Sequence, residues 1–262
     1  MLSKLTDFPG WTPRLPDGKR ILVVGASGGI GRALIEMLGK NNIMIGAHYA
    51  TNLTELKRIE IENASIQYLQ KQIYSDFDCE EVVDEFAKSA GGLDGIVVLV
   101  GGIKKSAHFM QLTSEEWEHD IFLNLSVPFY LSRASIRKMK EAGNGGRIIL
   151  NGTESALHGG SYLSFPYGIS KAGTECMVKG LAREGAKDSI LVNGIRLGFI
   201  ASGFHERWNK KGPKELRERA ELVPLKRGGM PEEVAALIIY LLSDWSKFIT
   251  GQMFAITGGD WL

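Results

Sequence analysis

Ile21-Leu22-Val23-Val24-Gly25-Ala26-Ser27-Gly28-Gly29-Ile30-Gly31 is the stretch of sequence that decides the fold. Its first four residues predict a buried strand, and the apolar positions that follow recur at helical spacing. A glycine-rich turn between strand and helix lets the backbone and the positive end of the helix approach a phosphate. The spacing differs from the common Gly-x-Gly-x-x-Gly fingerprint, and a tight turn that binds nothing is the alternative. We expect a dinucleotide cradle with the cofactor-binding residues Gly25, Ser27, Gly28, Gly29, Ile30 and Gly31.

Strand and helix patterns alternate along the rest of the chain. The pattern predicts further strands at 43–48, 66–69, 95–100, 147–150, 190–195 and 252–256, and helices that begin at Asn52 or span 79–88, 114–140, 167–186 and 231–243. Such alternation indicates a parallel sheet covered on both faces and joined by right-handed crossovers. Residues 1–19 contain three prolines and are expected to form an irregular arm, held by Trp11, before a single domain at 20–262.

The composition narrows the class of protein. The 262 residues include 31 Lys and Arg against 30 Asp and Glu, so bulk charge gives no reason to expect nucleic acid or an anionic membrane as a partner. The longest apolar runs fall short of a bilayer span and no secretory signal is found, so a cytoplasmic protein is expected. Cys79 and Cys176 lack metal-type spacing and are expected to be packed, reduced thiols. No metal site is expected.

Tyr167-Gly168-Ile169-Ser170-Lys171 carries the candidate chemistry. Residues four apart share one face of a helix, so the phenol and the ammonium group are expected to be neighbours. A free phenol has a pKa of about 10, and a nearby cation favours the phenolate. The pair predicts proton transfer near neutral pH, although an exposed helix pair without function has the same spacing.

The order of these motifs resembles the short-chain dehydrogenase/reductase family from Ile21 to Gly259. The matching segments are the glycine turn, Asn124, Tyr167-x-x-x-Lys171, residues 193–198, Pro224-Leu225-x-Arg227, residues 231–235, residues 250–252 and Thr257-Gly258-Gly259. The resemblance implies an α/β fold, a Rossmann-type doubly wound parallel sheet of about seven strands in three layers. It also implies hydride transfer between a nicotinamide cofactor and a carbonyl or alcohol, in a homodimer or homotetramer built through two long central helices.

The resemblance also implies catalytic roles. Tyr167 would be the general acid or base. Lys171 would lower the pKa of Tyr167 and bind the nicotinamide ribose. Asn124 would hold a water that connects Lys171 to solvent.

One further catalytic position is ambiguous, because the family has a serine near the end of the fifth strand that polarises the carbonyl. The strand alignment puts Thr153 there, whereas the usual spacing to the tyrosine lands on Glu154, which when ionised has no proton to donate. We favour Thr153, with Ser155 as the fallback donor.

The family pattern is altered at three further points. Leu99-Val100-Gly101-Gly102 replaces Asn-Asn-Ala-Gly, Leu197-Gly198 replaces Pro-Gly, and Val24 replaces a threonine. These replacements bear on the predicted activity more than on the predicted fold. The other cofactor contacts that the resemblance implies are Gln72 beside the adenine, Gly101, Gly102, Gly198, Ile200 and Ser202, with Tyr167 and Lys171.

Residues 43–52 bear on the choice of cofactor. An NAD site places an Asp or Glu about 20 residues beyond the glycines, to accept from the ribose 2′-hydroxyl. This stretch has no acidic residue and ends in Tyr49-Ala50-Thr51-Asn52, with Arg32 expected nearby. Such donors suit a 2′-phosphate, so NADP is favoured and NAD is the alternative.

Residues 199–222 occupy the place of the family's substrate lid. The candidate pocket residues are Phe204, His205 and Trp208, with Ser155, His158, Tyr162 and Phe165 from the loop before Tyr167. We expect a reductase of ketones or a dehydrogenase of secondary alcohols acting on a small molecule. A 3-oxoacyl-thioester reductase is one alternative, because residues 49–52 resemble those enzymes. A non-catalytic dinucleotide-binding scaffold is another.

Overall fold

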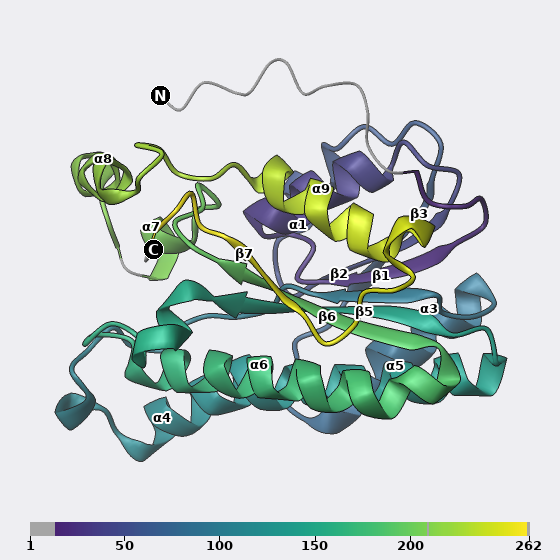
Figure 1. Cartoon of the computed structure of the whole chain (residues 1–262), viewed down its shortest axis with the longest axis horizontal. Helices are drawn as coiled ribbons and strands as arrows, with labels where there is room; N and C mark the ends of the chain where they lie inside the picture. Colours follow the sequence, from purple (N-terminus) through teal and green to yellow (C-terminus); the bar gives the residue numbers. More distant parts are fainter. Residues whose placement is uncertain (1–13, 209, 261–262) are drawn as a thin grey trace.

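A parallel sheet forms the centre of the molecule. The computed structural model describes residues 14–208 and 210–260. Within these residues, seven strands lie in the order β3-β2-β1-β4-β5-β6-β7 (Figure 1). The strands are β1 (Arg20–Val24), β2 (Met44–Tyr49), β3 (Ser65–Gln70), β4 (Gly95–Val98), β5 (Gly146–Thr153), β6 (Ile190–Leu197) and β7 (Met253–Ile256). The direction of winding reverses between β1 and β4, so the predicted doubly wound sheet is confirmed.

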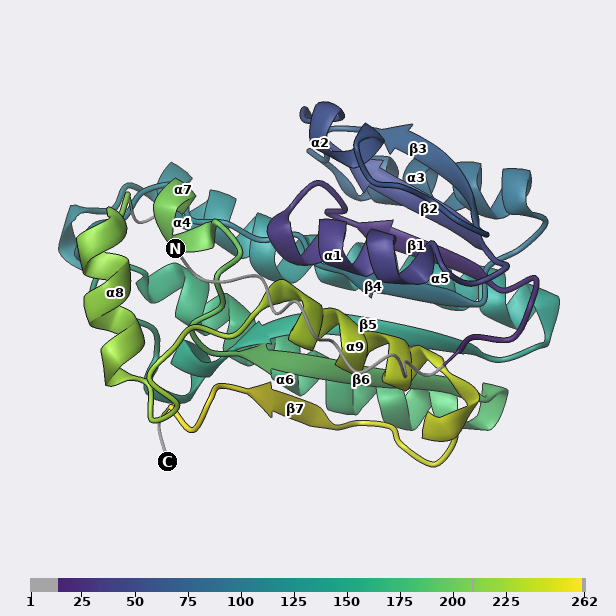
Figure 2. The ribbon, with the colours of Figure 1, turned by 90° about the horizontal axis from the view of Figure 1, so that it is seen from above.

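Helices cover both faces of the sheet (Figure 2). One face carries α1 (Gly29–Leu38), α2 (Thr54–Lys57) and α9 (Pro231–Leu242), and the other carries α3 (Asp76–Ala90), α4 (Ser114–Ile121), α5 (Val127–Ala142) and α6 (Phe165–Gly185). Each layer encloses its own apolar cluster, with Leu34 and Ile238 in the first and Phe86 and Leu131 in the second. A fully buried side chain of this size contributes about 1.5–3 kcal/mol. The two clusters therefore hold a rigid sheet whose strand ends position the site.

The segment predicted as one helix over 114–140 is two helices. A π-helical turn, η2 (Phe122–Ser126), separates α4 from α5. Asn124 lies in the middle of this turn, and its Nδ2 donates to the carbonyl oxygens of Asp120 at 2.9 Å and Gly102 at 2.8 Å. Its Oδ1 accepts from the Gly102 N–H at 3.1 Å. The wider turn thus aims a buried amide at the loop that follows β4.

Two short helices occupy the segment expected only to be polar. These are α7 (Phe204–Trp208) and α8 (Pro213–Leu222), which lie together at one end of the sheet (Figure 2). Single 3₁₀ turns complete the described structure: η1 (Phe109–Gln111), η3 (Glu154–His158), η4 (Ala186–Asp188) and η5 (Asp244–Ser246).

Two expectations about the arm and the thiols change. Residues 14–19 have no regular element, as expected, but Leu15 is buried and its N–H donates to Asn41 Oδ1 at 3.0 Å. Trp11 lies outside the described residues. Cys79 is buried, whereas Cys176 is exposed on α6, so the prediction of two packed thiols is wrong for Cys176.

Membrane-spanning and metal-binding features were sought in the described part of the chain. None of its helices combines the length and the apolar character that a membrane crossing requires. It also contains no group of three or more His, Cys, Asp or Glu side chains arranged to hold a metal ion.

Candidate active site

A cleft of about 520 Å³ opens where the strands end. Its first wall is the glycine turn between β1 and α1 with the loop after β4. Its second wall is the end of β5 and the start of α6. Residues of the lid segment, defined as residues 199–208 and 210–222, also line it. The predicted residues Gly25, Ser27, Gly28, Gly29, Ile30, Gly31, Gly101, Thr153, Ser155, Tyr167, Gly198, Ile200 and Ser202 all line it.

The glycine turn presents bare backbone to the cleft. Gly25 has φ +88°, and a Cβ on it would lie 3.1 Å from the Val100 nitrogen. A Cβ on Gly29 or Gly31 would collide with backbone oxygen. Because α1 begins at Gly29, the free N–H groups of its first turn lie at this surface. The turn therefore fits the pyrophosphate of a dinucleotide, which backbone N–H groups can bind without an intervening side chain.

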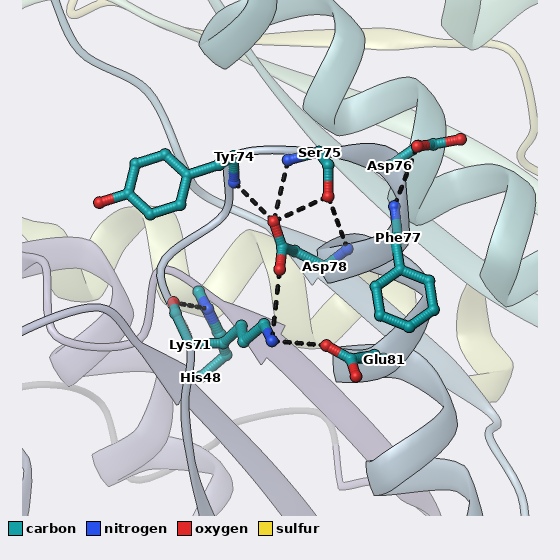
Figure 3. A network of polar contacts seen from close by, with 8 residues as sticks. All are labelled: His48, Lys71, Tyr74, Ser75, Asp76, Phe77, Asp78 and Glu81. Atoms are coloured by element: carbon teal, nitrogen blue, oxygen red, sulfur yellow. Dashed lines mark hydrogen bonds and ion pairs between the residues drawn. The ribbon is translucent and has the colours of Figure 1, made fainter.

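His48, at the end of β2, holds the glycine turn from behind. Its Nδ1 accepts from the Gly25 N–H at 3.4 Å, and its Nε2 lies 2.9 Å from the Lys71 carbonyl oxygen. Burial lowers the pKa of His48, so the ring is neutral and Nε2 carries the proton. Lys71 in turn binds Asp78 at 3.3 Å and Glu81 at 2.5 Å (Figure 3). His48 therefore connects the cradle to a charged network at the start of α3, a role that the sequence did not indicate.

The residues expected around the adenosine do not gather as predicted. Of the four at 49–52, only Ala50 lines the cleft, and Thr51 and Asn52 are exposed outside it. Tyr49 is buried in the core and its hydroxyl donates to Gln70 Oε1 at 3.3 Å. Gln72 is exposed and accepts from the Tyr74 hydroxyl.

Arg32 also meets an unexpected partner. Its Nη1 lies 2.9 Å from Glu55 Oε2, and Arg58 binds the other oxygen of Glu55 at 2.6 Å. Two guanidinium groups thus share one carboxylate beside α1.

The catalytic candidates do converge. Tyr167 and Lys171 lie in the first turns of α6, both buried, with Lys171 Nζ 5.8 Å from the centre of the Tyr167 ring. The Thr153 side chain acts on the Tyr167 phenol and favours its ionised form, and Thr153 Oγ1 lies 3.0 Å from Ser155 Oγ. Both candidate hydroxyl donors therefore line the cleft with the phenol.

Asn124 and Lys171 meet at Gly101. A Cβ on Gly101 would lie 3.0 Å from Asn124 Oδ1 and 3.4 Å from Lys171 Nζ. Gly102 is fully enclosed and does not line the cleft itself, because Trp208 covers it. The predicted trio of Tyr167, Lys171 and Asn124 is thus contiguous.

Burial dominates the pKa values of Tyr167 and Lys171. It raises the pKa of Tyr167 to about 12, against the opposing effect of the Thr153 hydrogen bond. It lowers the pKa of Lys171 to about 7. The tyrosine pKa was expected to be lowered by the lysine cation, whereas burial raises it.

Sequence reasoning missed Asn151, and the structure gives it two roles. Its carbonyl oxygen accepts from Lys171 Nζ at 2.9 Å. Its Oδ1 is buried at the cleft with no hydrogen-bond partner among the described residues, so a bound molecule with a donor group would satisfy it. No sequence signal marks this asparagine, because side chains on both faces of a strand recur at every second residue and the spacing does not show which face meets the cleft.

Glu154, which one alignment had put at the hydroxyl position, also lines the cleft. It is 6% exposed, and its Oε2 has no hydrogen-bond partner in the part of the chain described. Burial raises its pKa.

The lid segment rests on both glycine-rich loops. The Trp208 indole covers Gly102, where an added Cβ would lie 2.9 Å from Trp208 Cζ2. The Ser202 carbonyl oxygen lies against Gly29. Four of the expected pocket residues line the cleft, namely Ser155, Phe204, His205 and Trp208, and three do not: His158, Tyr162 and Phe165.

Comparisons with known proteins agree with this geometry. Residues 25–260 match a family model described as enoyl-(acyl carrier protein) reductase. The chain is 32% identical over 244 residues to a 3-oxoacyl-[acyl-carrier-protein] reductase of Rickettsia felis, covering 92% of this chain and 96% of that protein. It is 29% identical to an acetoacetyl-CoA reductase of Acinetobacter over 94% and 98% of the two chains.

Solved structures give the same picture. A dehydrogenase/reductase from Sinorhizobium meliloti superposes with a TM-score of 0.85 at 26% identity, covering 95% of this chain and 97% of that one. A short-chain type dehydrogenase/reductase from Mycobacterium marinum gives 0.84 at 26% identity, over 94% and 96%.

Proposed function

Because the chain belongs to the short-chain dehydrogenase/reductase family and is an oxidoreductase of CH–OH and C=O groups, we propose that it reduces ketones with NADPH. The observation that carries this proposal is the buried Tyr167 phenol, which lines the same cleft as Thr153, Ser155 and the bare glycine turn. When bound, the nicotinamide supplies the hydride.

Tyr167 is suited to act as the acid of a reduction. With a pKa of about 12, its hydroxyl is protonated at neutral pH and its Oη can give a proton to the carbonyl oxygen of a ketone. The Thr153 hydroxyl donates a hydrogen bond to the same carbonyl oxygen while Tyr167 transfers its proton. After the transfer it donates a hydrogen bond to the Tyr167 phenolate instead. The reverse reaction needs the phenolate at the start, which burial disfavours.

Lys171 and Asn124 support that proton transfer. Lys171, with a pKa of about 7, bears a positive charge in part of the molecules at neutral pH and stabilises the phenolate as it forms. Asn124 fixes the Gly102 backbone through both its N–H and its carbonyl, which holds the wall opposite Tyr167 in position.

The first test is Tyr167→Phe, assayed as NADPH oxidation against a panel of ketones. Removing the proton donor is expected to lower kcat about 10²- to 10⁴-fold. NADPH binding should persist, because the glycine turn is unchanged. Tyr74→Phe is the matched control, since Tyr74 is 75% exposed and does not line the cleft. Unchanged turnover in Tyr167→Phe would contradict the mechanism.

The second test concerns NADP over NAD. The pair of guanidinium groups on Glu55 supports a 2′-phosphate beside α1, because one positive charge remains uncompensated. Arg32→Gln is expected to weaken NADP+ about tenfold and to leave NAD+ binding nearly unchanged, as measured by calorimetric titration. Arg137→Gln, on α5, is the control. Tighter binding of NAD+ than of NADP+ by the unmodified protein would reject the assignment.

A 3-oxoacyl-thioester reductase is the second candidate, favoured by the names of the relatives from Rickettsia and Acinetobacter. Turnover of an acetoacetyl thioester well above that of simple ketones would select it. Tight NADPH binding without turnover of any carbonyl compound would instead indicate a non-catalytic scaffold.

A further inference from the structure

The lid segment brings cationic side chains to the cleft. Arg207, Lys211 and Arg219 all line it. Arg219 is ion-paired with Asp260. Neither Arg207 nor Lys211 has an ion-pair partner within residues 14–208 and 210–260. Two positive charges at the edge of the cleft are therefore available to a ligand.

A line of aromatic rings in tilted and edge-on contact leads from the proposed acid to these cations. The ring centres of Tyr167 and Phe204 are 5.7 Å apart, those of Phe204 and His205 are 5.7 Å apart, and those of His205 and Phe199 are 5.0 Å apart. The Arg219 guanidinium lies 5.5 Å from the centre of the Phe199 ring. We call these four rings the ring wall. It offers apolar surface between the phenol and the far end of the cleft.

The far end of the ring wall is electropositive. Burial, with the positive charges of Lys211 and Arg219, lowers the pKa of His205 to about 4, so its ring is neutral near pH 7 and both cationic groups lie near it. Glu154 is the acidic residue that lines the cleft, and burial raises its pKa toward the neutral form. Asp260 is already compensated by Arg219. The cations are thus in excess.

We infer that the substrate carries an anionic group, a carboxylate or a phosphate, which Lys211 and Arg207 bind while the ring wall holds the carbon skeleton and Tyr167 meets the carbonyl. This inference rests on the proposed reductase function. A charge-assisted hydrogen bond to a partly buried anion contributes about 1.5–3 kcal/mol, which corresponds to about 10- to 100-fold in affinity.

Matched substrate pairs test the inference and separate the two sources of charge. The first pair is a 3-oxo acid and its methyl ester. The second is acetoacetyl-CoA and the neutral acetoacetyl thioester of N-acetylcysteamine. The anionic member of one pair is expected to have a kcat/KM at least about tenfold higher, and the pair that responds identifies carboxylate or phosphate. Equal kcat/KM values within both pairs would overturn the inference.

Lys211→Gln should reduce that preference about tenfold, because the anionic member loses one of its two cationic contacts. Lys214→Gln is the matched control, because Lys214 has an 84% exposed side chain on α8 and does not line the cleft. Persistence of the preference in Lys211→Gln would overturn the inference.

Binding measurements keep the inference distinct from the function on which it rests. NADPH affinity should be equal in Lys211→Gln and the unmodified protein. Weaker NADPH binding together with an unchanged acid preference would assign the cation to the cofactor and refute the inference. Calorimetry on the NADP+-loaded protein, with a carboxylate that has no reducible carbonyl and with its amide, needs no turnover. Binding of only the carboxylate, lost in Lys211→Gln, would support the anion site even if every ketone failed as a substrate.

Discussion

Lys171 is an ammonium group that is fully buried. Its Nζ donates to one backbone carbonyl, that of Asn151, at 2.9 Å. Burial lowers its pKa from 10.5 to about 7, so the folded state binds this proton less tightly than the unfolded chain does. Lys171 therefore lowers the free energy of unfolding, and the compensating gain is its proposed role in the active site.

Lys171→Met should stabilise the nucleotide-free protein while abolishing reduction. Replacing the buried cation with an apolar chain of similar length removes the desolvation cost but leaves the Asn151 carbonyl without its donor. We expect a net gain of about 1–3 kcal/mol, or about 5 °C in Tm, near pH 7. Thermal unfolding measures it, with the exposed Lys214→Met as the control. A lower Tm in Lys171→Met would contradict the account.

The same argument fixes a pH dependence. Between pH 7 and 10.5 the unfolded chain holds the Lys171 proton and the folded protein does not, so this group makes stability rise with pH in that window. Below pH 7 both states are protonated and the full cost is present. The stabilising effect of Lys171→Met should therefore shrink from pH 7 toward pH 10.

Residue-level predictions succeeded where the spacing itself defines the geometry. Tyr167 and Lys171 had to share a face of one helix, and they do. Tyr49 failed as a candidate for lining the cleft because a strand alternates its faces, and the sequence did not show that this side chain faces the core. Thr153 was favoured over Glu154 for the hydroxyl position, with Ser155 as the fallback, because one extra residue in the following loop shifts the assignment; the structure places Thr153 and Ser155 together at the cleft.

At the level of elements, the π-helical turn between α4 and α5 has the most direct link to the site. Asn124 lies in this turn, and its side chain contacts Gly102 and Asp120. The apolar pattern of 114–140 predicted one unbroken helix, because it does not show where the backbone hydrogen bonds change from i→i−4 to i→i−5. The lid helices α7 and α8 were missed for a similar reason, because their polar sequence has no buried stripe.

Asn124→Asp should destabilise the protein by about 3 kcal/mol or more. A carboxylate has no proton to donate to the two carbonyl oxygens that Nδ2 now binds, and it would be a buried charge among acceptors. Chemical denaturation measures the loss. Asn63→Asp is the matched control, because Asn63 is exposed. Equal stability in the two variants would show that the turn does not depend on this amide.

At the scale of the whole molecule, aromatic side chains remain exposed on the side of α4 and α5. Trp117 is 37% exposed, Phe129 is 40% exposed, and Phe109 in η1 is 51% exposed. The Arg133 guanidinium lies 5.8 Å from the centre of the Phe129 ring. Exposed apolar patches of this kind mark contact surfaces more often than free ones.

We expect a homodimer or homotetramer that uses this side of the molecule. Light scattering should give at least twice the mass of one chain, and Phe129→Arg should shift the equilibrium toward the monomer because a cation would face a second copy of itself across a twofold axis. Phe77→Arg is the control, since Phe77 is also exposed but lies on α3. A monomer at micromolar concentration would refute the expectation.

The whole fold was the most predictable feature. Continuous apolar runs such as 21–24 and 95–98 suit only strands that are covered on both faces, and the alternation with helices fixes parallel pairing. The closure of the cleft was not predictable, because it depends on contacts such as Trp208 with Gly102 that join residues 106 positions apart.

The central position of β1 has a consequence for the order in which the molecule can form. β1 pairs with β2, which follows it closely, and with β4, where Ile21 pairs with Gly95. β1, β2 and β3 follow one another in the sequence and are adjacent in the sheet, so they can associate early. β4, the other neighbour of β1, can pair only after the long connection between them closes. Gly25 touches Val100, just beyond that late strand. A nascent or refolding chain should therefore acquire its compact first half before it acquires any affinity for nucleotide, and nucleotide would arrive too late to guide the early steps.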